Sequence, residues 1–280
     1  MNLARARELL FSDPGLFCRK SAARIIRRVP LFPRRAVRNI RGVRFECDLT
    51  LDARVADMLF AAYEPDEIAV LERYLKTGDV FVDVGANIGY LTAVGASLVG
   101  PTGQVHSFEP VPEYFQRLES LRAANPDYSI HVNRIALGDH SGMAEIAQAA
   151  DGNIGWNTMV PGLLEGDSAR ARHSVPIQRL DAYLAEHGIT KVALLKVDAE
   201  GFELPVLRGA SGFLETARPR PAILVEVAPG AYPLLGARVG DLFDMLGRFG
   251  YSGFDVEHGG RPIAAASVTV TTNVLFLAAT

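Results

Sequence analysis

Short apolar runs and helix-like segments alternate along most of the chain. Runs rich in β-branched residues predict buried strands, and apolar positions that recur every three to four residues predict helices. Strands are expected at residues 79–84, 104–109, 129–136, 192–198 and 222–227. Helices are expected at residues 65–77, 88–98, 112–124, 181–187, 202–215 and 239–249. This alternation predicts a parallel sheet with helices on both of its faces.

The end of the chain breaks this alternation. Residues 251–256 and 269–278 are strand-like with no helix between them, so we expect them to pair antiparallel at one edge of the sheet. Segment 140–179 is less regular and contains short strand-like pieces. The sequence therefore predicts an α/β fold, with a doubly wound and mostly parallel seven-stranded sheet that ends in a reversed hairpin.

The N-terminal part of the chain differs in charge from the rest. Residues 1–45 hold 12 lysines and arginines but only two acidic residues, whereas the whole chain has a net charge of −3. The prolines at 14, 30 and 33 predict that this part forms one or two short, broken helices. We therefore expect a basic, helical extension over residues 1–60 and a main domain over residues 61–280.

The basic extension has two kinds of interpretation. It can contact anionic membrane lipids, a lipid-linked or sugar-phosphate acceptor, or nucleic acid. It can instead pack on its own acidic body or form a helical cap in a homodimer, which is the interpretation that we favour. Nucleic acid is not expected as a partner, because no aromatic residues are interleaved with the arginines.

Composition places the chain among ordinary globular proteins. It is 49% hydrophobic and 22% charged, and no apolar run is long enough to predict a transmembrane helix. Arg5, Arg7 and Glu8 interrupt any apolar signal core at the N-terminus. Cys18 and Cys47 have no metal-ligand spacing and predict no disulfide scaffold. We expect a cytoplasmic protein.

The densest motif is VFVDVGANIGY at residues 80–90, where a buried strand turns into a helix. Gly85 and Gly89 allow the backbone to approach a ligand closely. A dinucleotide site usually carries a Gly-x-Gly-x-x-Gly loop around a pyrophosphate. Here Asp83 lies in the approach to the loop, and its carboxylate would repel a pyrophosphate but attract an ammonium or sulfonium group. The motif therefore favours S-adenosylmethionine over NAD.

Two further motifs follow later strands. Glu109 ends the second predicted strand, where a carboxylate can accept hydrogen bonds from the diol of a ribose. Both NAD and S-adenosylmethionine contain such a ribose. Lys196, Asp198 and Glu200 follow the fourth strand, and the carboxyl ends of parallel strands meet at the ligand cleft. Glu203 either belongs to this cluster or serves the dipole of the following helix.

Together these motifs resemble the FkbM family of S-adenosylmethionine-dependent methyltransferases. The resemblance covers residues 60–278. It rests on eight short segments, which occur in the order and at the spacing seen in the family. These are Tyr63–Pro65, Asp83–Thr92, Phe108–Pro110, Asn133–Asp139, Leu180–Asp181, Lys196–Glu203, Val206–Ala210 and Ile223–Glu226. Ala199 and Phe202 depart from the family pattern, at positions with no chemical role.

The resemblance implies a class I, Rossmann-like methyltransferase fold and, most often, methylation of a hydroxyl oxygen. It implies that Glu109 holds the ribose hydroxyls, that Ala136 and Leu137 flank the adenine, and that Asp198 faces the methionine ammonium or the acceptor. It also implies a group of residues around the methionine end of the cofactor, namely Asp83, Gly85, Ala86, Asn87 and Gly89.

Transfer of a methyl group to an alcohol needs alignment and removal of a proton. Asp198 and Glu200 are the candidate catalytic bases, or they join Glu226 around a divalent metal, for which carboxylates favour Mg²⁺. His131 and His173 are weaker candidates for the base. Candidate acceptor contacts are Tyr63, Glu64, His173 and Trp156, the last within a Gly/Asn-rich segment at residues 152–160.

Three functions compete at this point. The first is an O-methyltransferase acting on a sugar, glycan or other hydroxylated natural product. The second is a nucleotide-linked oxidoreductase, which the glycine spacing and the reversed hairpin disfavour. The third is a non-catalytic cofactor-binding subunit, which the intact acidic and glycine positions disfavour. The sequence does not identify the acceptor.

Overall fold

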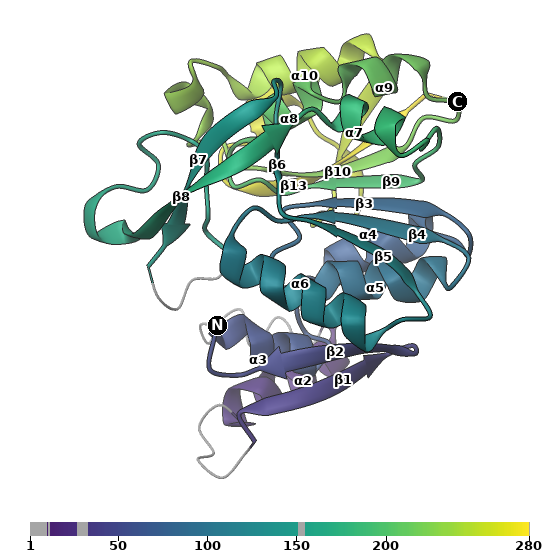
Figure 1. The fold of residues 1–280 in the computed structure, drawn as a ribbon, viewed down its shortest axis with the longest axis vertical. Coiled ribbons are helices and arrows are strands. Elements are labelled where there is room, and N and C mark those ends of the chain that lie inside the picture. The colour runs from purple at the N-terminus through teal and green to yellow at the C-terminus, as the bar shows by residue number, and fades with distance from the viewer. Residues whose placement is uncertain (1–9, 11, 27–32, 151–154, 280) are drawn as a thin grey trace.

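The computed structural model describes residues 10, 12–26, 33–150 and 155–279, and a twisted sheet forms its centre (Figure 1). The strand order is β12-β11-β13-β10-β9-β3-β4-β5. In chain order these strands are β3 (Val80–Val84), β4 (Gln104–Phe108), β5 (Ser129–Asn133), β9 (Leu194–Val197), β10 (Ala222–Val227), β11 (Tyr251–Asp255), β12 (Arg261–Pro262) and β13 (Thr272–Ala278).

The directions of these strands confirm the predicted fold. Strands β10, β9, β3, β4 and β5 run parallel, whereas β13 lies antiparallel between β10 and β11. All seven predicted strands are present in this sheet, and the two-residue β12 adds an eighth at its edge. Along β3, the side chains of Phe81 and Val82 are fully buried in separate apolar clusters, because successive residues of a strand point to opposite faces.

Helices cover both faces of the sheet (Figure 1). On one side lie α4 (Pro65–Tyr74), α5 (Tyr90–Val99) and α6 (Pro112–Ala124). On the other lie α7 (Leu180–Glu186), α8 (Glu203–Arg208), α9 (Ser211–Thr216) and α10 (Val239–Arg248). Three short 3₁₀ helices complete the set, at Gly166–Ser168, Tyr232–Leu235 and Ala265–Ser267.

Two predicted helix details are wrong. The single helix expected over residues 202–215 is divided into α8 and α9, and a Cβ at Gly209 would lie 1.9 Å from the carbonyl oxygen of Gly138. The helix predicted to begin at Asp181 begins one residue earlier: the N-cap of α7 is Arg179, and Asp181 lies in the first turn. There its carboxylate pairs with the Arg179 guanidinium at 2.6 Å.

A second sheet replaces much of the irregular segment 140–179. It has three strands in the order β6-β8-β7. They are β6 (Ala136–Leu137), β7 (Gly142–Ala149) and β8 (Ala169–Gln178). Strands β7 and β8 form a long antiparallel hairpin that projects from the body of the molecule (Figure 1). The strand predicted over residues 129–136 therefore divides between two sheets.

The N-terminal unit is only partly helical, so the prediction of helices alone is wrong. It contains α2 (Pro14–Ile26), β1 (Arg35–Ile40), β2 (Val43–Asp48) and α3 (Ala53–Leu59). Strands β1 and β2 form a hairpin whose two-residue turn, Arg41 and Gly42, has positive φ at both positions. This is the geometry of a type I′ turn, whose twist suits a tight hairpin.

The first proline begins a helix and does not break one. Pro14 is the first residue of α2, a position where the missing N–H of proline costs nothing. The carboxylate of Asp13 accepts a hydrogen bond from the Leu16 N–H at 2.8 Å and so caps this end. Residues 1–9, 11 and 27–32, including the predicted break at Pro30, lie outside the described residues.

The N-terminal unit shares its core with the main domain. Phe45 of β2 packs edge-on against Tyr90 of α5, with ring centroids 5.4 Å apart. The Arg44 N–H donates to the side-chain oxygen of Asn125 at 2.7 Å, and the Asn125 amide donates back to the Arg44 carbonyl at 2.9 Å. The described extension is therefore docked onto α5 and α6 (Figure 1). None of the helices in the described ranges combines the length and apolar character needed to cross a membrane.

Stacked histidines on β4 and β5 carry a consequence for acid stability. His106 is buried, its ring lies parallel to that of His131 with centroids 4.4 Å apart, and one ring nitrogen bonds the Tyr183 hydroxyl at 2.9 Å. Burial, together with the nearby His131 and His187, lowers the pKa of His106 to about 3. The unfolded chain binds a proton here below pH 6.5, whereas the folded chain stays neutral until far lower pH. Stability is therefore lost as the pH falls from about 6.5 towards 3.

We predict that His106→Gln removes part of the acid sensitivity of the fold. Between pH 7.5 and pH 5, the wild type should lose about 2 kcal/mol more of its free energy of unfolding than the variant does. Urea denaturation at both pH values measures this difference. The exposed His258, changed to Gln, is the control and should keep the wild-type loss. Equal losses in the wild type and His106→Gln would contradict a buried neutral imidazole.

Candidate functional site

A cavity opens at the carboxyl ends of β3, β4, β9 and β10, as expected for a parallel sheet. It encloses about 1130 Å³ when the space at its open mouth is included. Predicted site residues on its wall are Tyr63, Glu64, Gly85, Ala86, Asn87, Glu109, Ala136, Leu137, Asp198, Glu200 and Glu226. The structure therefore brings together eleven side chains or backbone segments chosen from the sequence.

The glycine loop after β3 is fixed to the neighbouring strand. The N–H groups of Gly85 and Ala86 both donate to the carbonyl of Phe108, each at 3.0 Å. The N–H of Asn87 donates to a carboxylate oxygen of Glu109 at 2.9 Å. Gly85 and Asn87 have positive φ values of 73° and 53°, so the loop takes a left-handed path along the cavity wall.

Gly85 also touches the loop after β9. A Cβ built on Gly85 would lie 1.7 Å from the backbone carbonyl oxygen of Asp198, far inside any allowed contact. Only glycine permits this approach. The glycine loop and the Asp198 segment therefore form one continuous piece of the cavity wall.

Glu109 lies beside this loop, and both of its carboxylate oxygens accept backbone hydrogen bonds. It is buried, and its second carboxylate oxygen accepts the N–H of Val111 at 2.8 Å. Burial raises its pKa to about 7, although the two backbone hydrogen bonds act in the opposite direction. Beyond it, Ala136 and Leu137 of β6 are buried and present small and apolar side chains to the cavity. This is the environment that a ribose and a flat base need.

Asp83 and Gly89 do not lie on the cavity wall, in contrast to the prediction. Asp83 is 0% exposed, because its side chain turns back against α5 and accepts a hydrogen bond from the Thr92 hydroxyl at 2.7 Å. Gly89 is the N-cap of α5, and a Cβ there would lie 2.8 Å from the Leu118 side chain. Both residues shape the loop from behind.

Lys196 lies at the centre of the carboxylates. Its side chain is 5% exposed, and its ammonium group lies 3.1 Å from Asp198 Oδ2 and 3.6 Å from Asp83 Oδ1. Burial alone would lower the pKa of Lys196, but the charges of Asp198 and Asp83 raise it well above its usual value. Lys196 therefore supplies a positive charge at the cavity wall.

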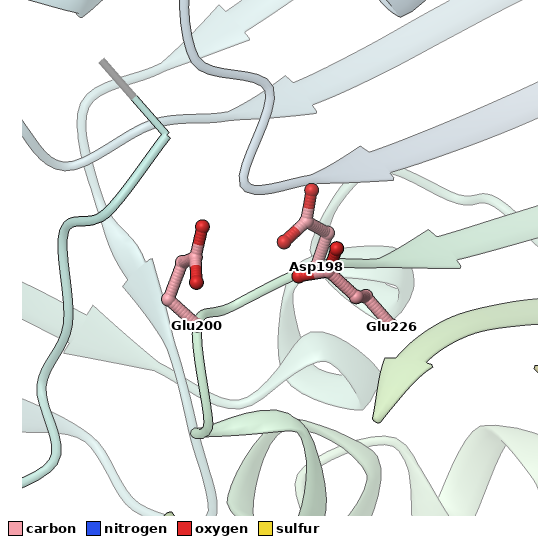
Figure 2. A group of neighbouring side chains, drawn as sticks. All are labelled: Asp198, Glu200 and Glu226. Atoms are coloured by element: carbon pink, nitrogen blue, oxygen red, sulfur yellow. The ribbon is translucent and has the colours of Figure 1, made fainter. Parts of the chain in front are cut away.

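Three carboxylates share the open side of this centre. Oxygen atoms of Asp198, Glu200 and Glu226 all lie within 4.8 Å of one another, and Figure 2 shows them turned towards a common space. The nearby charge of Asp198, and then burial, raise the pKa of Glu226 to about 11. Burial, and then the same charge, raise the pKa of Glu200 to about 9. Such crowding favours a cation, either a charged group of a ligand or a metal ion.

The remaining wall comes from residues distant in the sequence. Tyr63 and Glu64 precede α4, and Glu64 is held in a left-handed conformation with a φ of 43°. Residues that the sequence analysis did not choose as site residues also line the cavity: Arg54, Met58, Glu67, Tyr90, Asn157 and Met159. No local pattern marks them, because strand ends and loops far apart in the chain bring them together.

Two predicted acceptor contacts lie off the wall. Trp156 is 51% exposed, so it does not cap the core, and only its neighbours Gly155 and Asn157 line the cavity. His173 lies on β8, where its ring bonds the Gln148 side chain at 2.9 Å. Its strand carries it away from the carboxylates. Residues 151–154 of the predicted acceptor loop lie outside the described residues.

Arg38 connects the N-terminal hairpin to the cavity. Its guanidinium donates to the Tyr90 hydroxyl at 2.7 Å and to the carbonyl of Met58. Tyr90 and Met58 both line the cavity, and Tyr63 packs edge-on against Tyr90 with centroids 5.7 Å apart. The hairpin therefore supports the part of the cavity wall that Met58 and Tyr90 form.

Comparison with protein families gives a match over residues 83–252, more than half of the chain. The family is described as "Methyltransferase FkbM domain". This match confirms the resemblance that the motifs indicate, and it leaves the oxidoreductase alternative without support.

Curated relatives are 30% identical to this chain over the segments that align. The 31-O-demethyl-FK506 methyltransferase FkbM of Streptomyces tacrolimicus is 30% identical over 159 residues, covering 48% of this chain and 60% of that protein. The hexuronic acid methyltransferase AglP of Haloferax volcanii is 30% identical over 176 residues, covering 61% of this chain and 64% of that protein. The AMB antimetabolite synthetase AmbE of Pseudomonas aeruginosa is 30% identical over 246 residues, 74% of this chain but 11% of that protein. The matches therefore span less than two thirds of each relative's length.

Solved structures resemble the chain more distantly. The methyltransferase FkbM from Methylobacillus flagellatus KT aligns with 94% of this chain and 60% of its own, at 15% identity and a TM-score of 0.43. Fibrillarin from Aeropyrum pernix, solved with bound S-adenosylmethionine, aligns with 75% of this chain and 72% of its own, at 14% identity and a TM-score of 0.41.

We predict that Gly85→Ala destabilises the protein strongly. The new methyl group meets the Asp198 carbonyl and the residue has a φ of 73°, so the backbone must move. A loss of about 3 kcal/mol or more is expected, seen as a fall of roughly 6–12 °C in Tm. Gly230→Ala is the control, because no atom lies within 4 Å of its Cβ position. A Gly85→Ala protein with the Tm of the control would contradict the close contact.

Proposed function

Because the chain belongs to the FkbM methyltransferase family, we propose that it transfers the methyl group of S-adenosylmethionine to a hydroxyl oxygen of a sugar, glycan or other natural product. The observation that carries this proposal is the crowding of Asp198, Glu200 and Glu226 beside the glycine loop. The sulfonium and ammonium groups of S-adenosylmethionine are cations, and this crowded site favours them.

The cofactor is proposed to lie along the wall from Leu137 to the carboxylates. Ala136 and Leu137 flank the adenine, and Glu109 accepts hydrogen bonds from the ribose diol. The loop from Gly85 to Asn87 lies along the methionine part. Its ammonium group then points to Asp198, whose charge Lys196 holds in place at 3.1 Å. Asp83 supports Lys196 from behind.

Glu200 is the better of the two candidate bases. The carboxylate of Asp198 already has a partner in the protein, because Lys196 pairs with it at 3.1 Å. Glu200 carries a proton at neutral pH in the empty cavity, because its pKa is about 9. The positive charge of the bound cofactor lowers this pKa and frees the carboxylate. Glu200 can then take the proton of the acceptor hydroxyl while the new O–C bond forms, the C–S bond breaks, and S-adenosylhomocysteine leaves.

The same three carboxylates fit a divalent ion such as Mg²⁺, which prefers oxygen ligands. A bound ion would polarise the acceptor oxygen. Addition of a chelator to an active preparation tests this part of the proposal: retained turnover excludes a required metal and leaves Glu200 as the base.

The acceptor is proposed to bind between Glu200 and the far wall formed by Tyr63, Arg54 and Asn157. The names of two relatives specify a hexuronic acid and a demethylated FK506. Tritiated S-adenosylmethionine, incubated with hexuronic acids and hydroxylated macrolides, tests this class. Methyl transfer that disappears in Glu200→Gln supports the assignment, whereas near-normal transfer in that variant and in Asp198→Asn contradicts it.

The N-terminal unit is the proposed contact for an anionic or lipid-linked acceptor. Arg19, Arg24, Arg35 and Arg44 are exposed on it, beside the exposed side chain of Ile25. Flotation with phosphatidylglycerol vesicles tests this contact, with neutral phosphatidylcholine vesicles as the comparison. Equal recovery with both lipids would contradict it.

We predict that Glu109→Gln weakens the binding of S-adenosylhomocysteine by roughly 10–100-fold, because the ribose loses a charged acceptor. Isothermal titration calorimetry measures this change. Glu113→Gln is the matched control, since Glu113 lies one turn away on α6 and is not part of the cavity wall. Equal affinity in the two variants would remove Glu109 from the ribose site.

We also predict that S-adenosylmethionine displaces protons from the empty site. At pH 8 the raised pKa values of Glu200 and Glu226 leave both carboxyl groups largely protonated. The sulfonium charge favours their ionised forms, and S-adenosylhomocysteine lacks this charge. Calorimetric titrations in Tris and in phosphate at pH 8 measure the number of protons released on binding. Binding of S-adenosylmethionine should release about half a proton or more per protein beyond the number released by S-adenosylhomocysteine. Glu226→Gln should reduce the excess, and equal release by both ligands would contradict the placement of the sulfonium.

A further inference from the structure

Glu200 has an unusual backbone for the residue that carries the proposed chemistry. Its φ is 48°, in the left-handed region that side chains other than glycine rarely adopt. The following residue, Gly201, also has a positive φ, and a Cβ there would lie 2.3 Å from the Ala231 side chain. Such a conformation persists only where the surroundings hold it. The structure must therefore contain contacts that fix this turn.

Glu203 provides the first of these contacts. One of its carboxylate oxygens accepts the N–H of Ala199 at 3.2 Å and the N–H of Gly201 at 2.7 Å. These are the residues on either side of Glu200. Glu203 itself is 0% exposed and does not line the cavity. It cannot touch an acceptor there, but it holds the backbone that carries Glu200.

Thr158 provides the second contact, from the opposite side. Its hydroxyl donates to the carbonyl oxygen of Glu200 at 2.7 Å. Thr158 is 2% exposed, and its backbone N–H and carbonyl both pair with Ala147 of β7. The peptide groups around Glu200 are thus fixed by a carboxylate on one side and by a hydroxyl on the other.

The second carboxylate oxygen of Glu203 indicates that burial of this side chain does not by itself stabilise the fold. In the described part of the chain, neither this oxygen nor the buried hydroxyl of Tyr232 has a hydrogen-bond partner. Burial of an underused carboxylate is unfavourable, and burial raises the pKa of Glu203 to about 8. A role limited to the dipole of the six-residue α8 needs no such burial, since a solvated carboxylate would serve.

We propose that Glu203 is a positioning residue that acts through Glu200, by holding the turn at residues 199–201 so that the Glu200 carboxyl faces the acceptor. The catalytic part of this inference rests on the proposed function. The hydrogen bonds from Glu203 and Thr158 that hold the turn do not depend on that function, because they are present in the protein without ligands.

The test uses the ligand-free, full-length protein and two replacements of Glu203. Glu203→Gln keeps a carbonyl oxygen that can accept both N–H groups, whereas Glu203→Ala removes it. Amide exchange at Gly201 and the titration of the Glu200 carboxyl, both followed by NMR, are the readouts, with Glu200→Gln to assign the carboxyl signal. Glu215→Ala, on the exposed side of α9, is the control for loss of a glutamate.

Glu203→Ala should accelerate exchange at Gly201 at least tenfold and shift the titration midpoint of Glu200 by half a pH unit or more. Glu203→Gln should restore the exchange at Gly201 to near wild type, and the control should leave both readouts unchanged. An unchanged Glu200 titration in Glu203→Ala would overturn the proposal, and so would a Glu203→Gln protein in which Gly201 exchanges as fast as in Glu203→Ala.

Thr158→Val covers the case in which Glu203→Ala does not fold. It removes the hydroxyl on the other side of Glu200 with little change in shape, and it should shift the Glu200 titration as well. An unchanged titration in this variant would then overturn the proposal. Calorimetry of the wild type with S-adenosylhomocysteine is a separate arm: absence of binding there contradicts the methyltransferase function and leaves the NMR result to decide the support of Glu200.

Discussion

The site depends on one buried ammonium group. Lys196 lies near the end of β9 and contacts both Asp198, which directly follows that strand, and Asp83 of β3, so it joins two parallel strands close to where both become loops. Without this charge, the buried carboxylate of Asp83 and the partly buried carboxylate of Asp198 would repel each other without compensation. Lys196 also explains how so many acids can share a cavity: it offsets part of their charge but leaves a surplus for a positively charged ligand.

The two sides of the cavity differ in how they are encoded. The side proposed for the cofactor follows from short motifs at strand ends, and a parallel sheet brings those ends together whatever the details of the loops. Gly85, Glu109, Asp198 and Glu226 could therefore be predicted from the sequence. Asp83 was misplaced because a motif gives the position of a residue along a strand but not the direction of its side chain at the turn.

The acceptor side could not be predicted in this way, since its residues come from separate parts of the chain. Arg54 and Met58 belong to a unit that was predicted to be a basic, helical extension. Its hairpin was missed because the arginines of β1 mask the alternation of buried residues, and because the turn at Arg41 and Gly42 carries only one glycine. Trp156 was chosen for its chemistry alone, and its exposure reflects a loop whose path no local pattern specifies.

The contact between Gly85 and the carbonyl of Asp198 has a mechanical consequence. The two loops touch with no side chain between them, so one cannot be displaced without the other if the floor of the cavity is to stay intact. Any rearrangement that keeps this contact must then come from elsewhere along the rim. The wall that the N-terminal hairpin supports lies outside the contact, so it is a part of the cavity that can shift while the glycine loop and the Asp198 segment stay together.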